Sequence, residues 1–189
     1  MKLGTSKTAT RADERRRSLA RLRVGLLPGE RSRGRLLAGT CVVPCVLGPG
    51  GITRRKREGD GATPAGSFAL IRILFRPDRG PPPLSRLPCR ALRPGDGWCD
   101  DPRAARYNRP VVRPFRPGHE EMWRDDRLYD VVVVIDYNLS PARKGCGSAI
   151  FLHVEAAPSR PTAGCVAMDP RALRRLLGRV GPRTRIEIA

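Results

Sequence analysis

Five consecutive β-branched residues, Val131–Ile135, constrain the fold of this chain more than any other stretch. β-Branched side chains pack well on a pleated sheet and lose rotamer freedom in a helix, so the run predicts a strand. Successive side chains of a strand point to opposite faces, and here both faces are apolar. The run therefore predicts a central strand that is buried on both sides.

Several other short stretches have the composition of strands, and prolines and glycines separate them. They are residues 21–27, 35–47, Gly66–Phe75, 148–154 and Arg185–Ile188. The first two predict a hairpin across a turn, and Pro44, which lacks a backbone N–H, predicts an edge strand or a bulge. The third stretch is apolar on both faces, which again predicts a central position.

One short helix is predicted near the end of the chain. Asp169-Pro170 provides an N-cap residue followed by a proline that suits the first helical position. Apolar residues then recur at helical spacing, at positions 173, 176, 177 and 180. Together the elements predict a mainly β fold, in which two packed sheets form a β-sandwich with one short helix after Cys165.

The length of 189 residues predicts a single folded domain with a substantial core. Residues 1–20 are polar and rich in arginine, and we expect a flexible basic tail there, followed by a domain over residues 21–189. Within that domain, residues 76–121 are rich in proline and poor in apolar repeats, which predicts an irregular insertion. The aromatic residues Trp98, Tyr107 and Phe115 favour order in it, because such side chains pack on something.

The formal net charge of +19 raises nucleic acid as a partner. Only four of the 37 basic residues are lysine, however, and aromatic residues make up 5% of the chain, without any helix-turn-helix, RNP-like or zinc-finger pattern. We therefore consider nucleic acid an unfavoured partner and an anionic envelope surface a better one. The basic run at residues 54–57 is interpreted as a solvated face, apart from one or two side chains. No signal-peptide pattern and no transmembrane stretch are visible in the sequence.

Six cysteines without a signal peptide predict mostly free thiols, although pairing among five of them stays open. These five are Cys41, Cys45, Cys89, Cys99 and Cys146. Cys41 and Cys45 have no second tight pair to complete a zinc site, and His119-Glu120-Glu121 does not continue as H-E-x-x-H. We expect no metal and no organic cofactor.

The strand at residues 148–154 carries His153, and Cys165 follows twelve positions later, after a proline-containing loop and Gly164. A cysteine becomes a strong acyl-transfer nucleophile when an imidazole takes its proton. A buried cysteine near a histidine is also common in ordinary cores, so packing is the alternative. Position favours catalysis, because a strand end and a loop return are places where functional groups gather.

The motif around this pair resembles the signature of YkuD-type L,D-transpeptidases, which are cysteine enzymes acting on peptidoglycan stem peptides. The histidine, the loop and the segment Thr162-Ala163-Gly164-Cys165-Val166 carry the resemblance. Residues 61–68, with Thr63-Pro64 and Phe68, resemble a second segment of the same family. The family usually has a histidine where Ala163 stands, so this chain is similar to a divergent branch.

The resemblance implies roles for individual residues. Cys165 is the expected nucleophile and His153 the expected base, with the carbonyl of Val154 orienting its ring. The residues themselves add two expectations. Gly164 lets the backbone turn and expose the amides of Gly164 and Cys165, which, with the backbone at Ala163, are expected to bind the oxyanion. The helix after Asp169 is expected to point its positive end near Cys165 and lower the thiol pKa. The substrate-binding candidates are Trp98, Tyr107, Asn108, Arg160 and Thr162. The insertion either lines one wall of the cleft in this way or packs on the sheet without touching a ligand.

These expectations define the predicted function as an L,D-transpeptidase that acts through a thioester. Two alternatives stay open: an L,D-carboxypeptidase or amidase on the same substrates, and a non-catalytic basic envelope-binding module. The family implies a periplasmic or envelope location, and the missing signal pattern leaves a cytoplasmic one open.

Overall fold

The computed structural model describes residues 18–155, 157 and 160–189, so that most of the predicted basic tail lies outside the described residues. The strands are β1 (Arg21–Leu26), β2 (Arg33–Ala38), β3 (Cys41–Val46), β4 (Ile52–Thr53), β5 (Thr63–Pro64), β6 (Gly66–Phe75), β7 (Cys89–Ala91), β8 (Asp96–Cys99), β9 (Pro110–Val112), β10 (His119–Glu121), β11 (Val131–Ile135), β12 (Phe151–Val154), β13 (Val166–Met168) and β14 (Arg185–Ile188). The helices are the 3₁₀ turn η1 (Pro77–Arg79) and the α-helix α2 (Pro170–Leu177).

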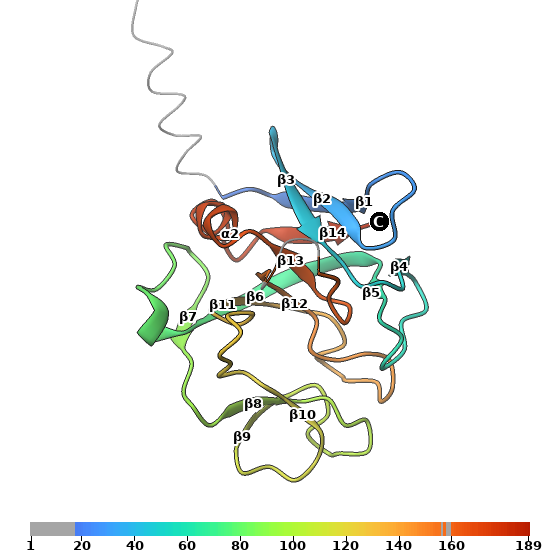
Figure 1. Cartoon of the computed structure of the whole chain (residues 1–189), viewed down its shortest axis with the longest axis vertical. Coiled ribbons are helices and arrows are strands. Elements are labelled where there is room, and N and C mark those ends of the chain that lie inside the picture. The colour runs from blue at the N-terminus through green and yellow to red at the C-terminus, as the bar shows by residue number, and fades with distance from the viewer. Residues whose placement is uncertain (1–17, 156, 158–159) are drawn as a thin grey trace, which may run out of the picture.

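The main sheet curls into a barrel-like arrangement (Figure 1). Its strand order is β11-β12-β13-β3-β2-β1-β14-β6-β7, and an additional pairing joins β11 to β6. β6 makes this closure possible because it has ten residues: the part from Gly66 to Ala69 pairs with β14 and the part from Leu70 to Phe75 pairs with β11. The predicted two-sheet β-sandwich is therefore wrong in its architecture, although the mainly β class is confirmed.

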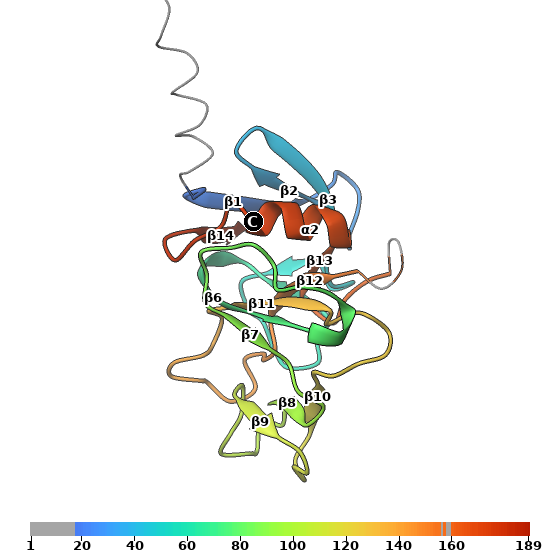
Figure 2. The ribbon, with the colours of Figure 1, turned by 90° about the vertical axis from the view of Figure 1, so that its left-hand side faces the viewer.

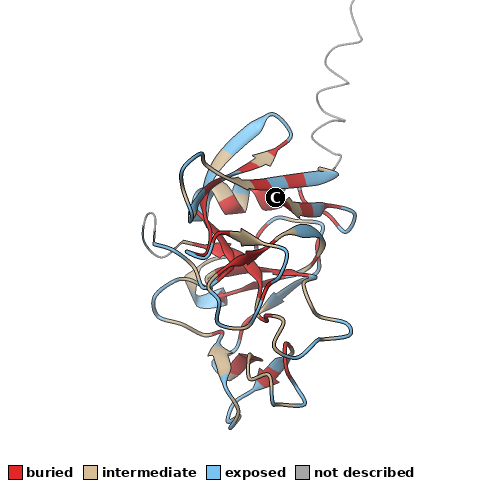
Figure 3. Cartoon of the chain, turned by 90° about the vertical axis from the view of Figure 1, so that its right-hand side faces the viewer, coloured by how far each residue is buried: buried red, intermediate tan, exposed pale blue. Residues whose placement is uncertain are grey.

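Strand β11 is buried at all five positions, as its sequence predicts. Val131, Val133 and Ile135 belong to the main core cluster, whereas Val132 and Val134 belong to a second cluster on the opposite face. The outer strands differ, because β1 alternates between buried and exposed positions over its first four residues. Figure 3 shows this alternation in the strands at the top of the view and denser burial through the centre.

The main core cluster fills the barrel, and α2 contributes Leu173, Leu176 and Leu177 to it. Asp169 caps this helix as predicted, since its side chain accepts a hydrogen bond of 2.9 Å from the N–H of Ala172. No helix in the described part of the chain has both the length and the apolar character needed to span a bilayer.

Within the segment from residue 76 to 121, β7 adds to the edge of the main sheet, and residues 96–121 form a small second layer. Strands β10, β8 and β9 make a three-stranded antiparallel sheet at one end of the long axis of the molecule, away from β1–β3 (Figures 1 and 2). The second core cluster joins this layer to the barrel: the Trp98 ring of β8 lies 5.1 Å from the Phe151 ring of β12 in an edge-to-face contact. The insertion thereby covers the outer face of the strands that carry the histidine.

Candidate active site

His153 lies on β12, where side chains alternate between the two core clusters. Leu152 and Val154 point into the barrel core, while Phe151 belongs to the outer cluster. His153 shares the outer face, and its ring meets the Tyr129 ring edge-to-face at 5.5 Å. Nδ1 of His153 lies 2.7 Å from the carbonyl oxygen of Val154. Because a carbonyl only accepts, Nδ1 carries the proton, and Nε2 of the neutral ring is left as the basic nitrogen.

The environment keeps His153 neutral. The residue is only 3% exposed. Burial lowers the pKa of the imidazole to about 4, against smaller opposing effects that include the backbone carbonyls of Val154 and Leu128. A neutral imidazole near pH 7 is the form that can accept a proton from a thiol.

Cys165 stands just before β13, which runs parallel to β12 and pairs Ala167 with His153. Its sulfur accepts a hydrogen bond of 3.3 Å from the N–H of Phe151 and donates one of 3.1 Å to the carbonyl of Ala149. Burial raises the pKa of the Cys165 thiol to about 12, more than offsetting the opposite effects of the Phe151 N–H and the Lys56 ammonium. The resting sulfur is therefore a protonated thiol held against a carbonyl.

The expectation that the helix dipole lowers the pKa of Cys165 is wrong. Strand β13 and Asp169 separate the cysteine from α2, which begins only at Pro170. The effect of a helix terminus falls off within about one turn, and desolvation of the sulfur dominates its pKa.

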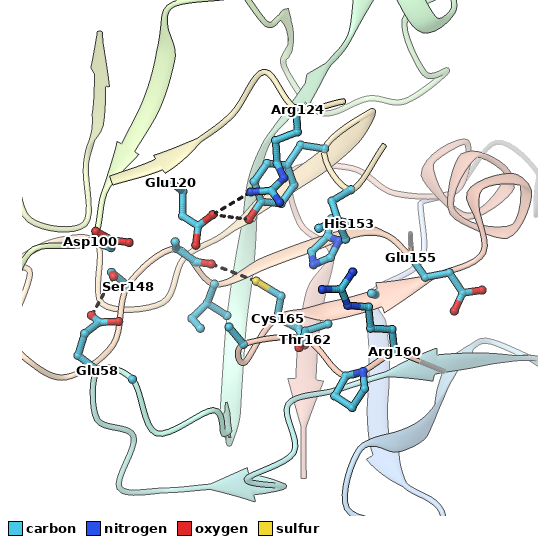
Figure 4. A pocket seen from close by; sticks show the side chains of 18 of the residues that line it. Glu58, Asp100, Glu120, Arg124, Ser148, His153, Glu155, Arg160, Thr162 and Cys165 are labelled. Atoms are coloured by element: carbon cyan, nitrogen blue, oxygen red, sulfur yellow. Dashed lines mark hydrogen bonds and ion pairs between the residues drawn. The ribbon is translucent and has the colours of Figure 1, made fainter. Parts of the chain in front are cut away.

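Cys165 and His153 line the same cavity, which has a volume of about 560 Å³. Figure 4 shows both side chains directed into it. The cavity is lined by charges of both signs. Its carboxylates are Glu58, Asp100, Glu120 and Glu155, and its cations are Lys56, Arg124 and Arg160. Glu58, Asp100 and Glu120 lie on one side of the sulfur, and Glu155 lies on the other side near Arg160 and His153 (Figure 4). Arg124 forms an ion pair of 3.8 Å with Glu120.

The backbone groups expected to form the oxyanion site are partly engaged. The N–H of Gly164 donates to the hydroxyl of Thr162 at 3.1 Å, and that hydroxyl donates to the carbonyl of Cys165 at 2.7 Å. Gly164 has a φ of 131°, and a Cβ there would lie 2.6 Å from the carbonyl oxygen of Ala62. The glycine thus allows the cysteine loop to approach the 61–68 segment closely, while Ala163 is exposed and lines the cavity.

The five predicted substrate-binding residues separate into two groups. Arg160 and Thr162 line the cavity. Trp98, Tyr107 and Asn108 are buried and are not part of its lining. The insertion folds with these three side chains turned inward against the barrel, an orientation that an irregular sequence does not reveal.

Asn108 forms the centre of a buried hydrogen-bond network behind the cavity. Its Oδ1 accepts from the indole N–H of Trp98 at 2.9 Å and from the backbone N–H of Ala149 at 3.0 Å. Its Nδ2 donates to the carbonyls of Tyr137 and Asn138 at 3.1 and 2.7 Å. Ala149 has a φ of 51°, which is unfavourable for alanine, and its carbonyl holds the Cys165 thiol. Asn108 thereby fixes the turn whose carbonyl contacts the Cys165 thiol.

Lys56 is a cavity residue that the sequence interpretation did not single out. Its side chain lies in a slot between two glycines, because a Cβ on Gly147 would lie 2.8 Å from Lys56 Cγ and one on Gly164 would lie 3.5 Å from Lys56 Cε. The ammonium donates to Asp60 at 2.5 Å and to the carbonyl of Arg57 at 2.8 Å. The only sequence signal was a basic run in which one or two side chains were expected to be functional.

The carboxylates of the cavity were also missed. Glu58 accepts hydrogen bonds from the hydroxyls of Tyr107 and Ser148, and Glu120 accepts one from Tyr129. Burial raises the pKa of Glu120, and the neighbouring Asp100 raises it further. Burial likewise raises the pKa of Asp100. These three acids and Glu155, which also lines the cavity, come from distant parts of the chain and give no local pattern, so only the fold reveals them.

All six cysteines are free thiols in the structure, with Cys41 exposed and Cys45 buried. No group of three or more histidine, cysteine or acidic residues within residues 18–155, 157 and 160–189 has the arrangement of a metal site.

Comparison with known proteins gives one family match. The sequence model of the YkuD family, described as the L,D-transpeptidase catalytic domain, matches residues 32–188. No curated protein and no solved structure matches the chain.

Proposed function

This chain belongs to the YkuD family of L,D-transpeptidase catalytic domains, and we propose that it is a cysteine acyltransferase acting on peptidoglycan stem peptides. The observation that carries the proposal is the shared cavity of Cys165 and His153, in which the imidazole is neutral and its Nδ1 is held by the Val154 carbonyl. No metal or organic cofactor takes part in this chemistry.

The resting state favours general-base catalysis over a preformed thiolate. Both groups are neutral near pH 7, since the thiol pKa is raised to about 12 and the imidazole pKa is lowered to about 4. Proton transfer from Cys165 to Nε2 of His153 therefore accompanies the attack of sulfur on the substrate carbonyl. The thiol must first break its hydrogen bond to the Ala149 carbonyl, and we expect substrate binding to cause this.

In the remaining steps, one proton moves from the Cys165 thiol through His153 to the leaving amine. Attack forms the C–S bond and a tetrahedral oxyanion, and its collapse breaks the C–N bond to the D-amino acid. The imidazolium of His153 gives its proton to that leaving amine, and a thioester on Cys165 remains. An acceptor amine then attacks the thioester and transfers a proton through His153 back to the sulfur. Water in place of the amine gives the carboxypeptidase outcome.

Lys56 is assigned the stabilisation of negative charge in these steps. The Gly164 N–H is bonded to Thr162. The Lys56 ammonium donates to Asp60 and to the carbonyl of Arg57, but it also lines the cavity, and its charge favours the anionic form of the Cys165 sulfur. We expect Lys56→Met to slow acylation of Cys165 by about tenfold to a hundredfold, the size of a lost oxyanion donor or less. Lys56→Arg keeps the charge but is too large for the glycine slot, so partial rescue is expected. Acylation rates equal to the wild-type rate in Lys56→Met would remove this role.

The charges of the cavity fit a substrate that carries both signs. Arg160 suits a carboxylate of a stem peptide, whereas Arg124 is already paired with Asp126. The wall of Glu58, Asp100 and Glu120 suits an amine. The same wall favours transfer to an amine over hydrolysis, because its carboxylates attract an acceptor ammonium and can take the proton that the amine must lose before it attacks the thioester.

Two experiments test the proposal. A carbapenem should acylate Cys165, seen as a mass increase of the protein that is absent in Cys165→Ala. Labelling of another cysteine, or none, contradicts the assignment. Incubation with a stem peptide and an acceptor amine then separates a transferase, which makes the joined product, from a hydrolase. A non-catalytic envelope-binding module predicts instead that Cys165→Ala retains every measurable function.

A further inference from the structure

A second cavity, of about 460 Å³, lies between the barrel and the small sheet of the insertion. Strands β6 and β11 provide one wall, and β8 and β9 provide the other. It shares no lining residue with the cavity of Cys165. Leu74, Trp98 and Val134, which line it, belong to the same core cluster as Cys165 and so form part of the partition between the two cavities. We call this second cavity the arginine groove.

A bulge in β6 shapes the groove. The register between β6 and β11 shifts at this point, since Val134 pairs with Arg72 and Ile135 pairs with Leu70. Ile71 is the extra residue, and both Ile71 and Arg72 line the groove. A bulge re-aims side chains in this way, so one apolar and one cationic residue of a single strand reach the same cavity.

The floor of the groove is apolar and its cations are in excess. The apolar residues that line it include Ile71, Leu74, Trp98, Val111, Val134 and Leu139. Val112, which also lines it, is 72% exposed. Four arginines line the groove: Arg72, Arg90, Arg106 and Arg109. One acid lines it, Asp96, which pairs with Arg90 at 3.0 Å. Within the described part of the chain, no carboxylate forms an ion pair with the other three arginines.

This combination identifies the chemistry of an occupant. A small anion would leave the apolar floor uncovered, and a neutral hydrocarbon would leave Arg72, Arg106 and Arg109 without a counter-ion, although Arg106 donates to the carbonyl of Pro110 at 2.9 Å. An anionic phospholipid satisfies both, because its phosphate accepts paired hydrogen bonds from guanidinium groups and its acyl chain covers apolar side chains. The net charge of +19 also attracts the protein to an anionic bilayer surface.

We propose that the arginine groove binds the headgroup phosphate and the first part of the acyl chain of an anionic phospholipid, and that it docks this domain on a membrane surface. Val112, exposed at the groove, enters the interface between headgroups and acyl chains. The proposal is independent of the chemistry at Cys165, because the two cavities have no residue in common.

The test is sedimentation of the full chain with phosphatidylcholine vesicles that do or do not contain phosphatidylglycerol. The groove variant is Arg72→Gln with Arg109→Gln. The matched control is Arg171→Gln with Arg183→Gln, which removes the same amount of charge. Both arginines are exposed; Arg171 lies on α2 and Arg183 lies just before β14. We expect the groove variant to bind phosphatidylglycerol vesicles about tenfold or more weakly and the control to change by less than about threefold. Equal weakening in both variants means general surface attraction and overturns the proposal.

Two further measurements identify the ligand. Val112→Asp should remove the part of vesicle binding that survives high salt, because that part comes from apolar contact; an unchanged salt-resistant part overturns the proposal. Soluble glycerol phosphate should compete poorly with vesicles. Competition by glycerol phosphate at matched phosphate concentration would instead assign the groove to a free phosphate, and strong competition by an acidic peptide with apolar residues would assign it to a protein partner. Thermal unfolding checks that each variant folds.

Discussion

The barrel and the insertion divide the work of the candidate active site between them. The barrel strands and the loop after β12 carry the two groups proposed to react, because His153 lies on β12 and Cys165 stands before β13. The insertion lines the cavity with Asp100 and Glu120 but donates no hydrogen bond to the sulfur. It instead holds Ala149, the residue whose carbonyl contacts the thiol, through the side chain of Asn108. The position of the His153 ring thus depends on the alternation of side chains along β12. The position of the Cys165 thiol depends on the buried side-chain amide of Asn108, which comes from an irregular segment.

The difference between the regions predicts different kinds of mutational effect. Substitution of a reacting residue in the barrel should slow acylation of Cys165 with little effect on folding. Substitution of an insertion residue that positions the Cys165 loop should lower both the acylation rate and the stability, because its hydrogen bonds are buried. The predictions that follow test this division, beginning with the largest effect.

His153→Gln should slow acylation of Cys165 by a carbapenem about a thousandfold, within the usual range for loss of a general base. The other histidine provides a matched control: His119→Gln changes a half-buried residue on β10 whose Nδ1 contacts the carbonyl of Pro117. We expect less than about a threefold change there. Mass spectrometry of the acylated protein over time gives both rates. Similar losses in the two variants would place the base outside the barrel strand.

The pH dependence of stability offers a second test at the same residue. The folded pKa of His153 is lowered from 6.5 to about 4, so the unfolded chain binds more protons between these values. Stability from this residue is fully present above about pH 6.5 and is lost as the pH falls toward 4, by up to about 3 kcal/mol. Urea unfolding of the wild type and of His153→Gln at pH 7 and 4.5 isolates the contribution. An identical loss in both proteins would mean that other groups cause the acid sensitivity.

Alternation makes the barrel side of this comparison predictable from sequence. The β-branched run 131–135 specifies a strand buried on both faces, and the apolar alternation of β6 specifies a central one. Closure of the barrel was not predictable, because it depends on β6 pairing with β14 over one part and with β11 over another. A two-sheet arrangement satisfies the same local patterns.

The residues that position the cavity could not be predicted from local sequence patterns. Asn108 acts on Ala149, 41 positions away, and Lys56 lies between glycines at positions 147 and 164. Neither contact produces a periodic sequence pattern, because each joins one side chain to backbone that is distant in the sequence. The sequence identified Asn108 and Tyr107 as important but assigned them to substrate contact. Their burial instead supports a positioning role.

Asn108→Gly tests that positioning role. Asn108 has a φ of 54°, a conformation that glycine adopts freely, so this substitution removes the side chain without straining the backbone. The Trp98 indole and the Ala149 N–H lose their acceptor. We expect acylation of Cys165 to slow by about tenfold to thirtyfold and stability to fall by about 2 kcal/mol. Arg103→Ala, an exposed change in the same segment, is the control. A stability loss without a rate loss would reduce Asn108 to a structural residue.

Asp169→Ala provides the opposite case, a barrel-side change that should affect stability alone. Asp169 caps α2 through the N–H of Ala172 and is exposed, so its loss should cost about 1 kcal/mol. The helix packs into the barrel core through Leu173, Leu176 and Leu177, on the face of β12 that does not carry His153. Acylation of Cys165 should therefore keep its wild-type rate. Asp169→Asn, which retains a capping acceptor, should recover most of the stability. A reduced acylation rate in Asp169→Ala would show that α2 positions the cysteine after all, and the division between reacting barrel and aligning insertion would then fail.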